Sequence, residues 1–508
     1  MTLADLVDQG EATRAAIGAP DRSPMSYAQL RGLRRHLMAG FARHGLGAND
    51  RIAIVLANGP EMATSFIIVA SLATAAPLNP AYTAVEFEYY LSDLKPKAIV
   101  IAVGEATPAR DVATRRGIPI IELDRTVDAP AGTFDLDFGG IATRPLAKIP
   151  RDEDIALVLH TSGTTSRPKI VPLSQRNLCA SAHNVSHTLA LLPDDRCLNI
   201  MPLFHIHGLI AAVLSSLYAG ACVSCTTGFN AMKFFAWMAA EQPTWFSAVP
   251  TMHQAILARA QRNQAILARS RVRFIRSSSA SLPSPVMQQL EETFSCPVIE
   301  SYGMTEAAHQ MTSNRLPPGQ RKSGSVGAPA GPEVRLMDPS GAFTVGAAAG
   351  EIVIRGANVT PGYDANRQAN ADAFAADPDG GDAWFRTGDQ GIFDADGFLT
   401  ISGRLKEIIN RGGEKIAPRE VDEVLMDHAA VAQVVTFAMA HPKLGEDVAA
   451  AVVLREGTAV TERELRDFAA KSLVAFKVPR KIVFLDEIPT GATGKLQRIG
   501  LAAKLGLG

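Results

Sequence analysis

A chain of 508 residues is too long for a single compact core, so two or more domains are expected. Hydrophobic residues make up 47% of the sequence and charged residues 20%, which is ordinary for a globular protein and excludes extended disorder. The formal net charge of −1 provides no field to attract nucleic acid or an anionic membrane, so neither is expected as a partner.

The chain ends and the cysteines predict a cytoplasmic protein. Residues 1–5 lack the basic and apolar zones of a secretory signal, and residues 505–508 do not form a peroxisomal tail. Five cysteines are an odd number in a long chain, which favours reduced thiols over a disulfide framework. The longest apolar stretch, 65–78, is too short to span a bilayer and is predicted to be a buried helix.

Strands and helices are predicted to alternate along the N-terminal part of the chain. Short apolar runs predict strands at 51–57, 98–102, 155–159, 244–249, 272–275 and 297–299. Amphipathic segments between them predict helices at 60–71, 177–192, 252–268 and 284–293. This alternation is typical of a layered α/β architecture with mostly parallel sheets.

A hydroxyl-rich loop, HTSGTTSRPK at 160–169, follows the predicted strand 155–159 and precedes a helix that should begin near Ser174. Small residues let backbone N–H groups approach phosphate oxygens, and the hydroxyls donate further hydrogen bonds. Arg167 and Lys169 offset the charge. The loop therefore indicates polyphosphate binding, although it lacks the spacing of a Walker loop.

The pattern changes after about residue 350 to short strands with Gly and Asp turns, including a predicted hairpin turn at 394–397. A smaller α+β unit is then predicted from helices at 417–428 and 461–472 and strands at 431–439, 448–454 and 482–485. The expected organisation is a large N-terminal domain of layered α/β subdomains (1–403), a boundary at 404–406, and a small α+β C-terminal domain (407–508).

Five further motifs follow the hydroxyl-rich loop: SYGMTE at 301–306, TGD at 387–389, GRLKE at 403–407, NRGGEKI at 410–416 and GATGK at 491–495. In this order they resemble the adenylate-forming superfamily of acyl-CoA synthetases, luciferases and peptide-synthetase adenylation domains, over essentially the whole chain. Within that superfamily, MPLFHIHG at 201–208, VPTMHQ at 249–254 and TEAAHQ at 305–310 look most like oxalate–CoA ligases.

The resemblance implies that the chain activates a carboxylic acid with ATP as acyl-AMP, releases pyrophosphate and passes the acyl group to CoA. A carboxylate is a poor acyl donor, and attack on the α-phosphate converts its oxygen into a leaving group. Two anions must meet in this step, so cations and oriented hydrogen bonds are expected to carry the catalysis.

The resemblance also implies roles in the nucleotide site. Tyr302 would stack on adenine, Thr305 would bond the α-phosphate and Glu306 would bind Mg²⁺, which needs only one or two carboxylates beside phosphates. Asp389 would accept both ribose hydroxyls, with Arg404 helping. The expected ATP- and AMP-binding residues are Thr161, Ser162, Gly163, Thr164, Thr165, Lys169, Ser278, Ser279, Ala280, Tyr302, Gly303, Thr305, Asp389 and Arg404.

The same resemblance implies that the C-terminal domain is mobile. Lys495 would bridge the acyl carboxylate and the α-phosphate, and is expected to be catalytic together with Thr305 and Glu306. Lys406 would be the hinge at which the domain changes pose. The residues expected to approach CoA are Gly412, Gly413 and Lys415.

One position departs from the pattern of the superfamily. Ile170 stands where its members usually have Gly after the loop lysine. If that backbone needs a positive φ, a β-branched side chain is strained there, and phosphate affinity would be altered.

Histidine and serine side chains predict a small diacid as substrate, because its far carboxylate needs hydrogen-bond donors. His309, four residues after Thr305, is predicted to share a helix face with it. His205 and His207 are expected to point oppositely in an extended segment, which argues against a metal site. The expected substrate residues are His205, His253, Ser278, Ser301 and His309, with His207 as a further candidate.

Ser301 also bears on the choice of acid. Malonate-activating relatives usually have Arg immediately before the Tyr of this motif, so Ser301 favours a shorter diacid, oxalate. The alternatives are a ligase for another small, aromatic or medium-chain acid, an adenylating module that loads a carrier protein, and a non-catalytic homologue. The glycines at 412–413 favour CoA, and intact Lys495, Glu306 and Asp389 favour catalysis. The sequence gives no signal for an oligomeric state.

Overall fold

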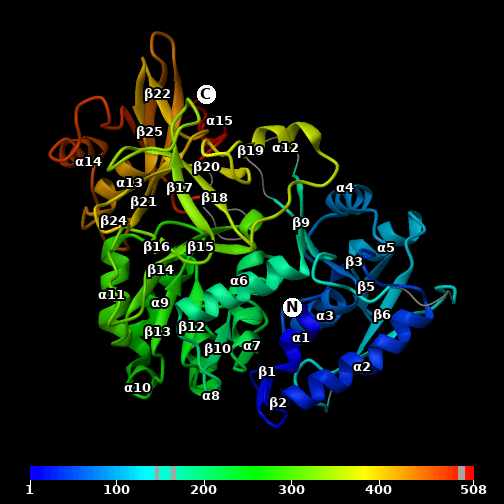
Figure 1. The fold of residues 1–508 in the computed structure, drawn as a ribbon. Coiled ribbons are helices and arrows are strands. Elements are labelled where there is room, and N and C mark those ends of the chain that lie inside the picture. Colours follow the sequence, from blue (N-terminus) through cyan, green and yellow to red (C-terminus); the bar gives the residue numbers. More distant parts are fainter. Residues whose placement is uncertain (127, 144–147, 162–167, 490–497, 508) are drawn as a thin grey trace.

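The computed structural model describes residues 1–126, 128–143, 148–161, 168–489 and 498–507. Two large sheets, each covered by helices on both faces, are followed along the chain by two smaller sheets. In Figure 1 the blue-to-cyan sheet and the green sheet lie side by side, and the yellow-to-red sheets lie above them. This arrangement confirms the predicted layered α/β fold.

The first large sheet contains β3 (Arg51–Val55), β4 (Thr74–Pro77), β5 (Ala98–Ala102), β6 (Ile120–Arg125), β7 (Phe134–Asp137), β8 (Ile155–His160) and β9 (Ile170–Ser174). Their order is β7-β6-β5-β3-β4-β8-β9; the central pairs are parallel and both edge strands are antiparallel. Alternate residues of β3 enter different hydrophobic clusters. As a result, α2 (Tyr27–Arg43) and α3 (Pro60–Leu72) cover one face, and α4 (Ala84–Leu94) and α5 (Pro108–Arg115) the other.

The second large sheet contains β1 (Ala15–Ala19), β2 (Arg22–Ser26), β10 (Arg196–Asn199), β11 (Cys222–Cys225), β12 (Trp245–Ala248), β13 (Phe274–Ser277), β14 (Val298–Met304), β15 (His309–Ser313) and β16 (Ala328–Pro329). Their order is β16-β15-β14-β13-β12-β10-β11-β1-β2, and the strands from β1 to β14 in this row are parallel.

Two sets of helices cover this second sheet. The face shared with the first sheet carries α1 (Leu3–Asp8), α6 (Gln175–Thr188), the π-helix η1 (His207–Leu214) and α7 (Ser215–Tyr218). The opposite face carries α8 (Phe234–Glu241), α9 (Pro250–Ala260), η2 (Gln261–Asn263), α10 (Gln264–Leu267) and α11 (Ser284–Phe294). The predicted helix 252–268 is therefore broken after α9.

The two smaller sheets are mainly antiparallel. The first contains β17 (Glu333–Met337), β18 (Gly350–Arg355), β19 (Phe374–Ala375), β20 (Trp384–Phe393) and β21 (Leu399–Arg404), with α12 (Arg367–Ala373). The second contains β22 (Ile409–Arg411), β23 (Glu414–Ile416), β24 (Val431–His441), β25 (Gly445–Leu454) and β26 (Lys481–Phe484), with α13 (Pro418–Met426), α14 (Glu462–Ala469) and α15 (Leu501–Lys504). The predicted turn at 394–397 connects β20 and β21, and this prediction is confirmed.

Local sequence signals explain where several helices begin. Ser174 caps α6 through a reciprocal pair of hydrogen bonds with Asn177, as predicted for a helix starting at this point. Proline occupies the first turn of α3, α5, α9, α11 and α13, where its missing N–H removes no helical bond. The apolar stretch 65–78 is only partly helical, because α3 ends at Leu72 and β4 follows. Among the described residues, every helix is too short or too polar to cross a membrane.

Candidate active site

The predicted nucleotide residues gather where parallel strands of the nine-stranded sheet end. Tyr302 and Gly303 lie in the last part of β14, and the turn η3 (Thr305–Ala307) follows with Thr305 and Glu306. Ligands of open α/β sheets bind at this edge. Gly303 is needed because a Cβ there would lie 1.8 Å from the carbonyl oxygen of His309 in β15.

The segment after β13 borders the same edge. Ser278 Oγ donates to the Ser301 carbonyl at 3.0 Å, and Ser301 Oγ donates to the backbone of β13 at 3.4 Å. Ser279 has a φ of +74°, a value that few residues with a side chain adopt, and its Oγ lies 3.1 Å from Nδ1 of His207. Ala280 follows in an exposed position. These bonds fix small polar groups between β13 and β14.

Asp389 connects this edge with the first of the smaller sheets. It lies opposite Arg404 in the β20–β21 ladder, and Arg404 Nε donates to its Oδ1 at 3.0 Å. The Tyr302 hydroxyl donates to the other carboxylate oxygen. Burial, and then the neighbouring Asp389 carboxylate, raise the pKa of Tyr302, so the phenol stays protonated and can only donate to Asp389. The structure thus brings together the three residues expected around the nucleoside.

Glu306 is buried at the same edge and accepts a hydrogen bond from the Tyr363 hydroxyl at 2.9 Å. Burial raises the pKa of Glu306, and the Tyr363 bond, Arg404 and Lys169 partly offset that effect. Lys169 Nζ lies 4.2 Å from the centre of the Tyr363 ring. Tyr363 links the expected phosphate and metal residues, and no motif in the sequence singles it out.

Mg²⁺ fits this donor set. The described residues contain no cluster of three or more side chains that could hold a metal alone. Glu306 offers one carboxylate beside Lys169, the end of the predicted phosphate loop. A single carboxylate completed by phosphate oxygens and water is the arrangement that Mg²⁺ commonly uses.

β9 lies between the hydroxyl-rich loop and α6, and α6 begins directly after Ser174, as predicted. The Thr161 N–H donates to the Lys169 carbonyl at 2.9 Å and closes the loop. The remaining predicted phosphate contacts lie outside the described residues: Ser162, Gly163, Thr164 and Thr165.

Ile170 begins β9, opposite His160, and its side chain is buried. It is not among the described residues that have a positive φ. The condition for strain at this position is therefore not met, because the residue after the loop lysine has extended backbone that suits a β-branched side chain.

Two predictions about the histidines are wrong. The turn η3 does not continue as a helix: Ala308 and His309 have φ values of +45° and +103°, and β15 begins at His309. His309 therefore does not share a helix face with Thr305. His207 begins the π-helix η1, so His205 and His207 do not alternate in an extended segment.

His207 and His309 nevertheless meet, with ring centres 4.9 Å apart and an interplanar angle of 87°. His207 Nε2 lies 2.6 Å from Ser247 Oγ, while Nδ1 faces Ser279. We call His207, His309, Ser247 and Ser279 the histidine cluster. It adjoins β14, the strand of Tyr302, because His309 lies opposite Met304 in the β14–β15 ladder. The sequence did not identify Ser247 as part of this cluster.

His253 lies on α9 instead, fully buried, with its ring centre 6.0 Å from that of Phe246. Burial lowers the pKa of His253 to about 4, so the ring is neutral at physiological pH. No hydrogen bond among the described residues joins it to the histidine cluster. His205 lies before η1, with its ring centre 6.2 Å from that of Phe204.

Two family profiles match the sequence. AMP-binding enzyme matches residues 6–364, and AMP-binding enzyme C-terminal domain matches residues 420–495. The chain belongs to the AMP-binding enzyme family.

Relatives in this family cover nearly the whole chain. An oxalate–CoA ligase of Arabidopsis thaliana is 44% identical over 461 residues, 89% of this chain and 88% of the relative. One from Saccharomyces cerevisiae is 40% identical over 475 residues, 88% and 86% of the two chains. The ATP-bound crystal structure of MatB from Rhodopseudomonas palustris has a TM-score of 0.88 at 27% identity, covering 99% of both chains.

Four of the C-terminal residues expected to act in this AMP-binding enzyme are described, and all four are exposed: Lys406, Gly412, Gly413 and Lys415. Lys406 lies in the turn after β21. Gly412 and Gly413, with φ values of +61° and +103°, form the tight turn between β22 and β23, a backbone that favours glycine. Lys415 lies exposed in β23. Lys495 is outside the described residues, so its position rests on the sequence.

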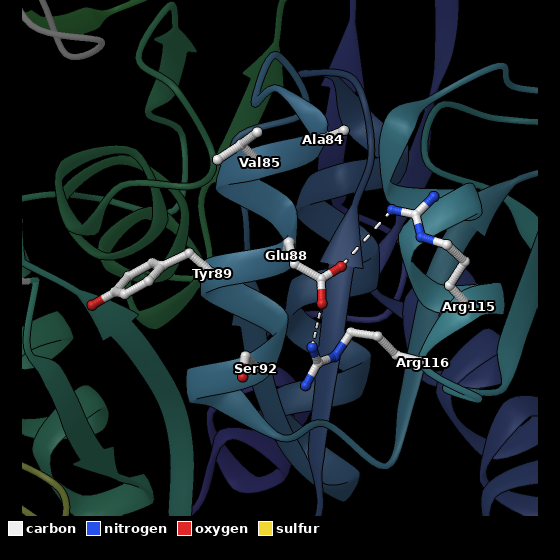
Figure 2. A pocket seen from close by; sticks show the side chains of 7 residues that line it. All are labelled: Ala84, Val85, Glu88, Tyr89, Ser92, Arg115 and Arg116. Atoms are coloured by element: carbon white, nitrogen blue, oxygen red, sulfur yellow. Dashed lines mark hydrogen bonds and ion pairs between the residues drawn. The ribbon is translucent and has the colours of Figure 1, made fainter.

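A separate surface groove of about 530 Å³ lies between α4 and α5. Figure 2 shows Glu88 at its centre, in ion pairs with Arg115, at 3.8 Å, and with Arg116. Glu88 offsets only one of these two guanidinium charges, so the residues that line the groove have a formal net charge of +1. It contains none of the residues predicted for the active site.

Proposed function

We propose that this AMP-binding enzyme is an ATP-dependent acid–CoA ligase that acts on oxalate. The observation that carries the proposal is the histidine cluster, which places two histidines and two serines beside the expected adenylate site. A hydrocarbon chain in that place would cover hydrogen-bonding groups without using them, which is costly. The distal carboxylate of oxalate uses them, and two relatives bear the name oxalate–CoA ligase.

In the proposed first half-reaction, one oxalate carboxylate attacks the α-phosphorus of ATP. The bond to the bridging oxygen breaks, pyrophosphate leaves and oxalyl-AMP forms. Lys169 and the hydroxyl-rich loop offset the polyphosphate charge, and Lys495 lies between the carboxylate and the α-phosphate to which Thr305 donates. Glu306 would hold Mg²⁺, which would supply further positive charge for the phosphates.

In the second half-reaction, the CoA thiol loses its proton and its sulfur attacks the oxalyl carbon, so that AMP leaves. The C-terminal domain (407–508) turns about Lys406, withdraws Lys495 and brings forward the tight turn of Gly412 and Gly413 together with Lys415. The exposed positions of Lys406, Gly412, Gly413 and Lys415 support this assignment.

The test is AMP release in the presence of CoA with oxalate, malonate, acetate, coumarate and octanoate. Oxalate should have the highest kcat/KM. A tenfold preference for octanoate or coumarate, about 1.4 kcal/mol of transition-state free energy, would overturn the assignment of oxalate. Adenylation without thioester formation would instead indicate a module that loads a carrier protein.

A further inference from the structure

Arg276 is a buried cation in the middle of the active-site sheet. It lies in β13 and is 0% exposed. The described residues provide no carboxylate as its ion-pair partner, whereas Arg273, three residues earlier, pairs with Asp195 at 2.6 Å. An uncompensated buried charge is expensive, by several kcal/mol.

The hydrogen bonds of Arg276 are long and reach only neutral groups. One terminal nitrogen lies 3.5 Å from Ser247 Oγ and the other 3.3 Å from Gln310 Oε1. Its Nε has no hydrogen-bond partner among the described residues. Burial lowers the pKa of Arg276 to about 9, which leaves the guanidinium charged at neutral pH. The structure therefore holds a positive charge in place without neutralising it.

Ser247 connects this charge to the histidine cluster. A guanidinium only donates hydrogen bonds, so Ser247 Oγ accepts from Arg276 and its own hydrogen is available to Nε2 of His207, at 2.6 Å. A neutral His207 then carries its proton on Nδ1, the nitrogen that faces Ser279. One serine hydroxyl thus separates a fixed cation from His207, and it orients the histidine as a donor toward Ser279.

We propose that Arg276 is a specificity-determining positioning residue that makes the acyl site select acids with a second negative charge. This inference rests on the proposed acid–CoA ligase function. Its positive charge compensates the distal carboxylate of the substrate, and through Ser247 it keeps the Nδ1–H of His207 directed at Ser279. A monocarboxylic acid loses its only charge when it becomes an adenylate, so it gains little from Arg276.

A structural role is the competing explanation. Gln310, which accepts from Arg276, also donates to Thr188 Oγ1 at 3.1 Å and to the Asn184 carbonyl at 3.3 Å, so this network ties α6 to β15. If Arg276 acted only through this packing, its replacement would weaken the fold and reduce the rates with all acids equally.

The experiment compares Arg276→Met, Arg276→Lys and the control Arg271→Met, an exposed arginine in the segment before β13. ATP–pyrophosphate exchange is measured with oxalate and malonate as diacids and with glyoxylate and acetate as monoacids. Arg276→Met should lower kcat/KM for the preferred diacid by about a hundredfold and for monoacids by less than about threefold. Arg276→Lys should recover at least a tenth of the diacid rate, and KM for ATP should not change.

Equal losses for diacids and monoacids in Arg276→Met, or full diacid activity in that variant, would overturn the inference. If wild type prefers malonate and Arg276→Met loses that preference, the assignment of oxalate fails while the inference stands. Thermal unfolding of each variant separates loss of fold from loss of selectivity. Arg276→Met should not lower the melting temperature, because it removes an uncompensated buried charge.

Discussion

Removal of one hydroxyl group tests the proposed metal site. In Tyr363→Phe the aromatic ring stays, so the contact with Lys169 Nζ is retained, and only the hydrogen bond to Glu306 at 2.9 Å is lost. Burial already raises the pKa of Glu306, and the Tyr363 hydroxyl lowers it. The substitution should therefore raise this pKa further and make the metal-binding carboxylate harder to ionise.

The size of the effect follows from the kind of bond. A hydrogen bond to a charged group contributes about 1.5–3 kcal/mol, and its loss should disfavour the ionised form of Glu306 by that amount. The proposed Mg²⁺ site requires this ionised form. As the pH is lowered, the adenylation rate of Tyr363→Phe should therefore decline at a higher pH than that of wild type. At alkaline pH the two rates should be equal.

The assay is ATP–pyrophosphate exchange between pH 5 and pH 9 at several Mg²⁺ concentrations. The control is Tyr218→Phe. In wild type the Tyr218 hydroxyl lies 3.0 Å from Nδ1 of His183, a contact that involves none of the described phosphate and metal residues. The acid limb should move upward, and half-saturation by Mg²⁺ should rise at low pH, only in Tyr363→Phe. An unchanged acid limb and Mg²⁺ requirement would refute the role of Glu306 as the metal ligand.

Three further predictions concern stability and the two half-reactions. Burial raises the pKa of Glu300 to about 7 from an ordinary 4.5, so Glu300 ionises at a lower pH in the unfolded chain, and the free energy of unfolding falls as the pH rises from 4.5 to 7. Glu300→Gln should remove about 3 kcal/mol of that fall, as measured by denaturant unfolding at pH 5 and pH 8. Gly303→Ala should unfold at a lower temperature, because its Cβ meets a backbone oxygen at 1.8 Å, whereas Gly32→Ala, with open space around it, should not. Lys495→Ala should lose about a hundredfold in adenylation rate yet still transfer preformed acyl-AMP to CoA. Lys406→Pro should instead form acyl-AMP but transfer it slowly to CoA. Parallel losses of pyrophosphate exchange and single-turnover thioester formation in both variants would contradict the two-pose mechanism.

Strongly periodic segments were predictable from the sequence, and short antiparallel strands were not. The apolar run 98–102 coincides with β5, and the predicted helix 284–293 lies within α11. β9 and β15 were missed because each is a five-residue antiparallel strand whose hydrogen bonds depend on a partner elsewhere. The helix predicted to contain His309 does not form because Ala308 has left-handed backbone, which ends the turn after Glu306. Nothing in the side-chain pattern signals this conformation.

The candidate site was predictable to the extent that its residues belong to contiguous motifs. Glu306 and Asp389 stand in such motifs, and the structure brings each to the expected edge. Tyr363 and Ser247 reach the site through pairings between distant segments, so no local spacing marks them. Arg276 was missed because a single arginine in a short strand normally indicates a solvated side chain, and its complete burial follows only from the register of β12, β13 and β14.

The distribution of charge links the two ends of the proposed site. Arg404 and Lys169 lie near Asp389 and Glu306, so the nucleotide end contains its own partners for both carboxylates. The acyl end holds Arg276 with neutral partners only. As the proposed substrate, oxalate enters with two negative charges and loses one when its reacting carboxylate becomes bound to AMP, whereas the distal carboxylate stays charged through both half-reactions. In this proposed reaction, a cation fixed in the sheet compensates that carboxylate throughout, including the step in which the C-terminal domain is expected to move and Lys495 to withdraw.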